Sequence, residues 1–113
     1  MKKLYNQIGL AQKGRMVSSG TLAVKSSLIG NKAQLLIISE DIAENTKEPL
    51  LNLCRKMNKP FIILGNKYDL GNAVGKAYRV AITINNVGMA QAILSKYAET
   101  GEEKSTEVDK WPK

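Results

Sequence analysis

The sequence predicts an α/β domain in which helices cover both faces of a parallel or mixed sheet. Two short runs, Leu35–Ile38 and Phe61–Leu64, are entirely apolar, as is typical of strands buried on both faces. Between and around these runs, apolar residues recur at the three- and four-residue spacing of a helix. Strands and helices that alternate along one chain usually form one sheet with helices on both faces.

The expected elements follow one another with short connections. In chain order they are a helix over 4–13, a strand over 16–18, a helix from 19–21 to 29, a strand over 33–39, a helix from 45–48 to 58, strands over 61–64 and 78–84, and a helix over 87–98. The sheet is therefore expected to have about four strands, a common number for a small domain.

Local signals predict the helix starts. Ser19 or Thr21 is the expected N-cap of the second helix. Asn45, with Glu48 three residues later, resembles a capping box for the third helix. Two interpretations stay open for residues 65–75, either a short helix flanked by conformationally permissive residues or a ligand-binding loop.

Length and composition indicate one domain, residues 1–98, followed by a flexible polar tail, residues 99–113. No apolar run approaches the ~20 residues of a membrane span. The initial Met-Lys-Lys is not followed by the apolar segment of a secretory signal, so none is expected. Cys54, the one cysteine, excludes an internal disulfide and fits a reducing, cytoplasmic compartment.

The absence of histidine excludes several kinds of chemistry. Serine–histidine and cysteine–histidine nucleophile pairs cannot form, and zinc would find one thiol and no imidazole. Cys54 lies among apolar residues at helical spacing and is expected to be a small buried hydrophobe. The sequence therefore predicts no catalytic residue, no metal site and no cofactor, and an enzyme is not expected.

One string is similar to a nucleotide-binding motif. Asn66-Lys67-Tyr68-Asp69 matches the guanine-reading Asn-Lys-x-Asp of GTPases. A GTPase also needs a phosphate loop, G-x-x-x-x-G-K-S/T. The nearest segment, Gly9 to Gly14, is followed by Arg15-Met16 and lies in or just after a predicted helix. Nucleotide binding is therefore not expected.

Positive charge is concentrated in the domain. The formal net charge is +7, and residues 1–98 contain fourteen bases and five acids. No acid precedes Glu40, whereas six bases do: Lys2, Lys3, Lys13, Arg15, Lys25 and Lys32. Such one-sided charge is typical of a protein that binds a polyanion such as nucleic acid.

Several segments carry a family resemblance. Residues 65–80 read Gly-Asn-Lys-Tyr-Asp-Leu-Gly-Asn-Ala-Val-Gly-Lys-Ala-Tyr-Arg-Val, which is similar to a segment of large-subunit ribosomal protein thirty-e. Upstream, Ser19-Gly20 leads a helix, Lys32-Ala33-Gln34-Leu35 opens a strand, and Glu40-Asp41 and then Asn45-Thr46 follow it. This order resembles ribosomal protein seven-Ae and its bacterial YlxQ-type relatives. The resemblance extends from residue 4 to residue 97 and identifies the chain as similar to the kink-turn RNA-binding ribosomal protein family.

The resemblance implies a three-layer α/β/α sandwich with a mixed sheet. It also implies a ribosome-associated protein that recognises structured RNA of the kink-turn type, without chemistry, through the loops Gly20–Ser26 and Gly65–Leu70. Helix N-terminal amides would meet phosphates or purine acceptors, and Tyr68 or Leu70 would support an unstacked base. The expected RNA-binding residues are Gly20, Thr21, Leu22, Lys25, Lys32, Gly65, Asn66, Lys67, Tyr68, Leu70 and Arg79.

The chain departs from the family pattern at the start of the second helix. Typical kink-turn binders carry Asn-Glu there and a lysine three residues after the Glu. Gapless alignment places Leu22, Ala23 and Ser26 at these positions. Lys25 is adjacent to the lysine position, but one helical step turns by roughly 100°. A second interpretation therefore stays open, in which the fold is kept and serves as a protein-interaction module.

Overall fold

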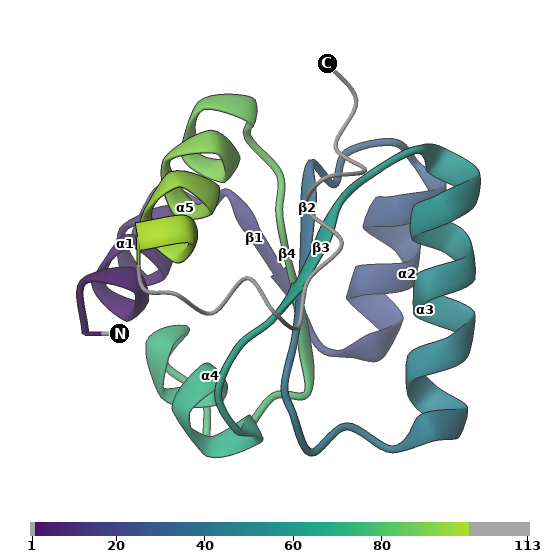
Figure 1. Ribbon diagram of the computed structural model, residues 1–113, viewed down its shortest axis with the longest axis horizontal. Coiled ribbons are helices and arrows are strands. Elements are labelled where there is room, and N and C mark those ends of the chain that lie inside the picture. The colour runs from purple at the N-terminus through teal and green to yellow at the C-terminus, as the bar shows by residue number, and fades with distance from the viewer. Residues whose placement is uncertain (1, 100–113) are drawn as a thin grey trace.

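The computed structural model describes residues 2–99, in which four strands form one sheet between two layers of helices (Figure 1). In chain order the elements are α1 (Lys2–Lys13), β1 (Val17–Ser19), α2 (Thr21–Ile29), β2 (Leu35–Ile38), α3 (Glu44–Met57), β3 (Phe61–Ile63), α4 (Lys67–Ala73), β4 (Ala81–Ile84) and α5 (Val87–Glu99). This is the predicted α/β/α sandwich. Except for Glu99, the expected polar tail lies outside the described residues.

The sheet is mixed, with the strand order β1-β4-β2-β3. β2 and β3 are parallel, whereas β4 is antiparallel to both of its neighbours, β1 and β2. β1, β2 and β3 therefore end at the same edge, which we call the carboxyl end of the sheet, and β4 begins there. The opposite edge, where β1, β2 and β3 begin, is called the amino end.

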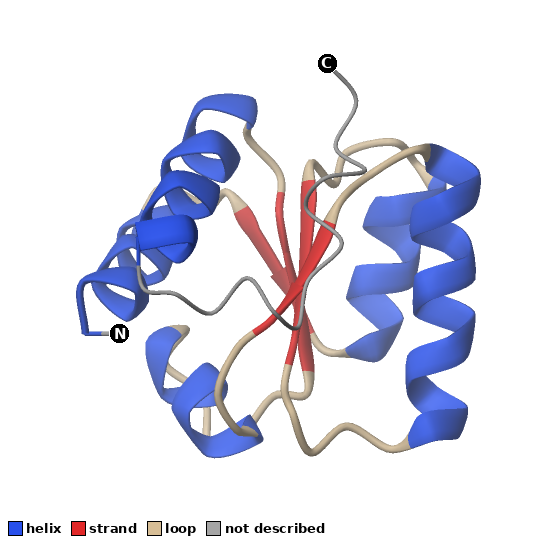
Figure 2. Ribbon diagram, viewed as in Figure 1, coloured by secondary structure: helices blue, strands red, loops and turns tan. Residues whose placement is uncertain are grey.

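The side chains of β2 supply both faces of the sheet. Leu35 and Ile37 pack in a core beneath α1, α4 and α5, whereas Leu36 and Ile38 pack in a second core beneath α2 and α3. Figure 2 shows the corresponding two layers of helices on either side of the strands. Successive strand residues point to opposite faces, so a strand covered on both sides must be apolar at every position. The prediction of a doubly buried strand is confirmed.

Both predicted helix caps are wrong. The N-cap of α2 is Gly20, and no side chain caps the helix. The Ser19 hydroxyl instead accepts a hydrogen bond from Arg79 Nε at 3.3 Å. α3 begins at Glu44, and its N-cap is Ala43 rather than Asn45. Glu44 then forms an ion pair with Lys47, one helical turn later, at 3.6 Å.

Two further boundaries bear on the site. Residues 67–73 form the short helix α4, one of the two interpretations left open. The strand expected over 78–84 begins only at Ala81, because the preceding residues turn toward α4. There the N–H of Arg79 donates to the Lys67 carbonyl at 2.9 Å, which carries Tyr78 and Arg79 away from the sheet.

Candidate nucleic-acid interface

Four connecting segments meet at the carboxyl end of the sheet. Gly20 donates its N–H to the Ala81 carbonyl at 3.0 Å, which joins the start of α2 to the start of β4. Glu40 donates its N–H to the Gly65 carbonyl at 2.7 Å, which joins the loop after β2 to the loop after β3. Backbone bonds of this kind fix the relative positions of loops that are far apart in sequence.

Arg79 connects the two loops that were expected to form the site. Its Nε donates to Ser19 Oγ at 3.3 Å, next to the start of α2, and its Nη1 donates to the Tyr78 carbonyl at 2.7 Å. A guanidinium group has five N–H donors. Arg79 is half-buried. Both of its acceptors are neutral oxygens, and the guanidinium keeps further donors for a ligand.

A lysine lies between two tyrosine rings beside Arg79. Lys67 Nζ is 5.4 Å from the ring centroid of Tyr68 and 5.6 Å from that of Tyr78. The two rings meet edge to face, with their centroids 6.5 Å apart. Tyr68 is 59% exposed and Tyr78 is 55% exposed. We call Lys67, Tyr68, Tyr78 and Arg79 the aromatic–cation cluster, since it presents both charge and ring surface to solvent.

The start of α4 is capped from within the protein. The side-chain oxygen of Asn66 accepts from the N–H groups of Tyr68 and Asp69, both at 2.9 Å. The N–H of Lys67 donates to Asp41 Oδ1 at 3.1 Å. These three amides are therefore not available to a phosphate. The Asn-Lys-x-Asp string is explained here as a helix cap, since its Asn occupies the N-cap position.

The start of α2 is different, because no side chain among residues 2–99 caps it. Its N-cap, Gly20, has φ 93°, a backbone conformation that favours glycine. The first N–H groups of a helix have no partner inside the helix, and they carry the positive end of its dipole. The first turn of α2 therefore keeps amides that can bind an anion or a base acceptor.

Gly71 holds the aromatic–cation cluster together. A Cβ added to Gly71 would clash with the Tyr78 backbone, reaching its carbonyl carbon at 2.7 Å and its nitrogen at 2.8 Å. The bare backbone of α4 thus lets the chain pass underneath and place Tyr78 beside Tyr68. Tyr78 was not among the expected site residues. In the sequence, only its position next to Arg79 pointed to a role for Tyr78. Residues 78–84 were predicted to be a strand, so this position was not considered part of a binding loop.

Four expected residues lie apart from the cluster. Leu70 is fully buried in the core beneath α4 and cannot support a base, so that role is corrected. Lys32 follows α2 and precedes β2, which places it at the amino end of the sheet, away from Lys67 and Arg79. Lys25 is exposed on α2, as are Leu22 and its neighbour Ala23, and Leu22 is 83% exposed.

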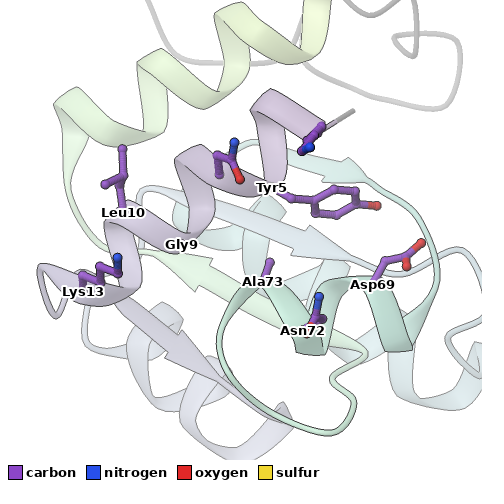
Figure 3. A pocket seen from close by; sticks show the side chains of 9 residues that line it. Tyr5, Gly9, Leu10, Lys13, Asp69, Asn72 and Ala73 are labelled. Atoms are coloured by element: carbon purple, nitrogen blue, oxygen red, sulfur yellow. The ribbon is translucent and has the colours of Figure 1, made fainter.

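A groove of about 750 Å³ lies between α1 and α4. Figure 3 shows the Tyr5 ring extending from α1 toward the part of α4 that carries Asp69. The lining combines Lys2 and Lys13 with Asp69 and includes none of the cluster residues, so the groove is a separate feature.

The described residues contain neither a metal-binding cluster nor a membrane helix. Among residues 2–99, no group of three Asp, Glu or Cys side chains lies close enough together to hold a metal ion. No helix in this part of the chain has the length and apolar character needed to cross a membrane.

The three-layer sandwich and the paired loops at one end of its sheet define a known class of small ribosomal-type domain. The chain belongs to the ribosomal protein L7Ae/L30e/S12e/Gadd45 family, whose model matches residues 2–94.

Among curated proteins, the chain is similar to the RNA-binding protein YlxQ of Bacillus subtilis. The two are 28% identical over 88 residues, which are 78% of this chain and 88% of the relative. A Bacillus halodurans protein of unknown function has a similar structure, with a TM-score of 0.80 and 29% identity over 84% of this chain and 96% of its own. A Giardia lamblia 15.5kD RNA binding protein shares the fold, with a TM-score of 0.70 and 21% identity over 85% of each chain.

Proposed function

We propose that the protein binds structured RNA of the kink-turn type through the aromatic–cation cluster and the uncapped start of α2. The observation that carries this proposal is the bridge formed by Arg79, which joins the cluster to the loop that begins α2. The names of two relatives, both RNA-binding proteins, support RNA as the ligand.

Each part of the surface has a physical role in this proposal. The free amides of the first turn of α2 bind a phosphate or the acceptor edge of a purine. Arg79 and Lys67 contact phosphates and add a salt-dependent term to the affinity. Tyr68 and Tyr78 support an unstacked base, which is how proteins usually recognise irregular RNA. Tyr78 takes the role that was first expected of Leu70.

The ribosome is the proposed setting for this binding, since the family is named after ribosomal proteins. The ligand would then be ribosomal RNA that contains a sharply bent internal loop, met in the cytoplasm. Binding needs no cofactor and involves no bond-breaking step.

The proposal is tested first with the purified protein and two RNAs, a kink-turn and a plain duplex of the same length, over a salt series. We expect tighter binding to the kink-turn at every salt concentration, by more than about 1.4 kcal/mol, a factor of ten in Kd. Equal and steeply salt-dependent binding to both RNAs would mean a generic basic surface and would overturn the claim of kink-turn recognition.

The residues are tested with Lys67→Ala combined with Arg79→Ala. This variant should lose affinity for the kink-turn and show a shallower salt dependence, by about one unit of slope for each phosphate that is no longer neutralised. Lys2→Ala with Lys3→Ala is the charge-matched control, because both lysines are exposed and lie on α1, outside the cluster. Circular dichroism shows whether both variants remain folded. Equal losses in the two variants would contradict the assignment of the site.

A second candidate function is protein interaction, and one observation favours it. Leu22 is 83% exposed at the position where RNA contacts are expected, and Ala23 beside it is also exposed. Apolar side chains at such a position suit a protein partner better than a phosphate backbone. In that case Lys67→Ala with Arg79→Ala would leave RNA retention unchanged, whereas Leu22→Asp would remove a protein partner from the complex.

A further inference from the structure

Six cations lie at the amino end of the sheet, opposite the aromatic–cation cluster. Their positions along the chain place them there. Two lie where α1 ends and β1 begins, one lies between α2 and β2, two lie in the last turn of α3, and one lies between α3 and β3. They are Lys13, Arg15, Lys32, Arg55, Lys56 and Lys59. Main-chain bonds hold these connections together, since Asn85 N–H donates to the Met16 carbonyl at 2.7 Å and Gln34 N–H donates to the Ile84 carbonyl at 2.8 Å.

The acids of residues 2–99 lie elsewhere. Three of them are in the loops or first turn at the carboxyl end, two are in the first half of α3, which starts from that end, and one is the last residue of α5, which runs toward it. They are Glu40, Asp41, Asp69, Glu44, Glu48 and Glu99. The ion pairs within residues 2–99 are Lys47–Glu44 and Lys96–Glu99. None of the six cations at the amino end is therefore paired with a described acid.

A polar groove of about 650 Å³ lies among these cations, beside the edge strand β1. Arg15 and Lys32 line it, and the rest of its lining is neutral, mostly hydroxyl and amide groups. Lys59 lies next to it, because its Nζ donates to Gln34 Oε1 at 3.3 Å and Gln34 lines the groove. Three cations without acidic partners therefore lie in or beside this groove, whose other lining residues are uncharged and mostly able to form hydrogen bonds.

A network of partly and fully buried polar side chains supports the groove. Ser18 and Ser27 share a hydrogen bond of 2.5 Å, and Asn85 Nδ2 donates to Ser18 Oγ at 3.0 Å. Thr83, which is fully buried, donates to Asn85 Oδ1 at 2.9 Å. Ser27 lines the groove and is 5% exposed. Because these groups hold one another in place, the groove is preorganised for a polar ligand.

Helix dipoles explain only part of this charge. Cations in the last turn of a helix are stabilised by its dipole, which accounts for Lys13, Arg55 and Lys56. Arg15, Lys32 and Lys59 lie just beyond the ends of α1, α2 and α3, where the effect of each dipole is weaker. Like charges gathered on one surface repel each other and reduce stability, so a polyanion is the partner that would relieve this repulsion.

We propose that the amino end is a second RNA contact, in which the groove and its rim bind the phosphodiester backbone of another RNA segment. Arginine and lysine bind phosphate oxygens, and serine and asparagine donate to them as well. The first surface includes the start of α2, whereas Lys32 follows the other end of this helix, which is nine residues long and so spans about 14 Å. The groove runs beside α2 between these ends, since Ala23 and Ser27 both line it. The protein would then join two RNA segments. This proposal rests on the proposed function for the first segment only.

The test compares two variants of the full chain that remove the same charge: Arg15→Ala with Lys32→Ala, and Lys67→Ala with Arg79→Ala. A plain RNA duplex is the probe for the amino end, titrated between about 50 and 200 mM salt. We expect the Arg15/Lys32 variant to bind the duplex at least fivefold more weakly, with a salt slope shallower by about 0.7–0.9 for each phosphate that it no longer neutralises. Its affinity for a kink-turn should stay within twofold of the unaltered protein.

Bridging is tested by adding labelled duplex to protein already saturated with a kink-turn RNA and following the ternary complex by sedimentation. The unaltered protein should form this complex, and the Arg15/Lys32 variant should not. Arg15→Gln with Lys32→Gln, which keeps the length of both side chains, replaces the alanine pair if that pair does not fold. Duplex binding that is unchanged in both the alanine and the glutamine variant overturns the proposal. So does an amino end that captures acidic proteins but no RNA duplex. Failure of the first site appears separately, as unchanged kink-turn binding in the Lys67/Arg79 variant.

Discussion

Arg79 shows how neutral groups can hold a cation ready for a ligand. The acceptors of its side chain are the Ser19 hydroxyl and the Tyr78 carbonyl, both uncharged. An acid in their place would neutralise the guanidinium and compete with a phosphate for the same donors. Lys67 has a similar environment, since its ammonium lies over two rings. The surface therefore keeps its charge available.

Cys54 has the opposite character, because its environment suppresses charge. Burial raises the pKa of its thiol from 9.0 to about 12, and nearby Arg55 lowers it by a smaller amount. A thiol reagent at pH 8 should therefore react with the native protein more than about a hundredfold more slowly than with the chain in denaturant. Only transient opening exposes the thiol, against a stability of roughly 5–15 kcal/mol. Equal rates in the two states would show that the thiol is accessible.

The same raised pKa sets the direction of a pH effect. The buried neutral thiol contributes its full stability below pH 9.0, and that contribution is lost as pH rises toward about 12. A Cys54→Ala variant should lack this part of the alkaline destabilisation, which equilibrium unfolding at several pH values would measure.

Single residues of the site were predicted unevenly, for a physical reason. Lys67, Tyr68 and Arg79 were expected and lie in one cluster, whereas Leu70 was expected and is buried. Tyr68 and Leu70 are separated by two helical steps, about 200°, so they point to nearly opposite sides of α4. Because residues 65–75 were left open as either a helix or a loop, the sequence did not determine which of these side chains would face the core.

At the scale of elements, two helical glycines have opposite roles. A Cβ at Gly71 would clash with the Tyr78 backbone, whereas a Cβ at Gly9 of α1 would meet the Ala73 carbonyl oxygen at an ordinary 3.5 Å. Gly71→Ala should lower the free energy of unfolding by about 1–3 kcal/mol, as overpacking does. Gly9→Ala should raise it by about 0.5–1 kcal/mol, because alanine favours a helix.

Urea denaturation of both variants measures these changes. Gly71→Ala should also weaken RNA binding, since it separates Tyr78 from Tyr68, and Gly9→Ala should leave binding unchanged. Equal stability changes in the two variants would contradict the assigned role of Gly71.

Helices and strands were predictable where burial decided them. β2 is apolar at every position because both of its faces are covered, and that pattern is visible in the sequence. The environment of Ser19 was not predictable, because its hydroxyl bonds a side chain sixty residues away. The start of β4 was also missed, since the bond from Arg79 to Lys67 that ends the ladder is a tertiary contact.

At the scale of the whole molecule, RNA binding should be coupled to folding. The proposed surface is built from three segments, at the start of α2, at the start of α4 and before β4, that only the folded chain brings together, so RNA should stabilise the native state. A kink-turn RNA at a hundred times its Kd should raise the free energy of unfolding by about 2.7 kcal/mol. For a domain of this size that corresponds to an increase in Tm of about 10 °C or more. An unchanged Tm would mean that the RNA binds the unfolded chain equally well.

The separation of charge along the strands gives the molecule an electrical polarity. Its shortest extent is 26 Å, several times the Debye length of about 8 Å at physiological salt, so its two ends act on a distant polyanion separately. Attraction of this kind raises association rates by roughly 10–1,000-fold. The basic amino end would reach RNA first, with the aromatic–cation cluster turned away. The first association with RNA would therefore be fast and independent of RNA structure. Recognition of a particular RNA structure would follow once the bound protein has reoriented or its cluster has met a second strand.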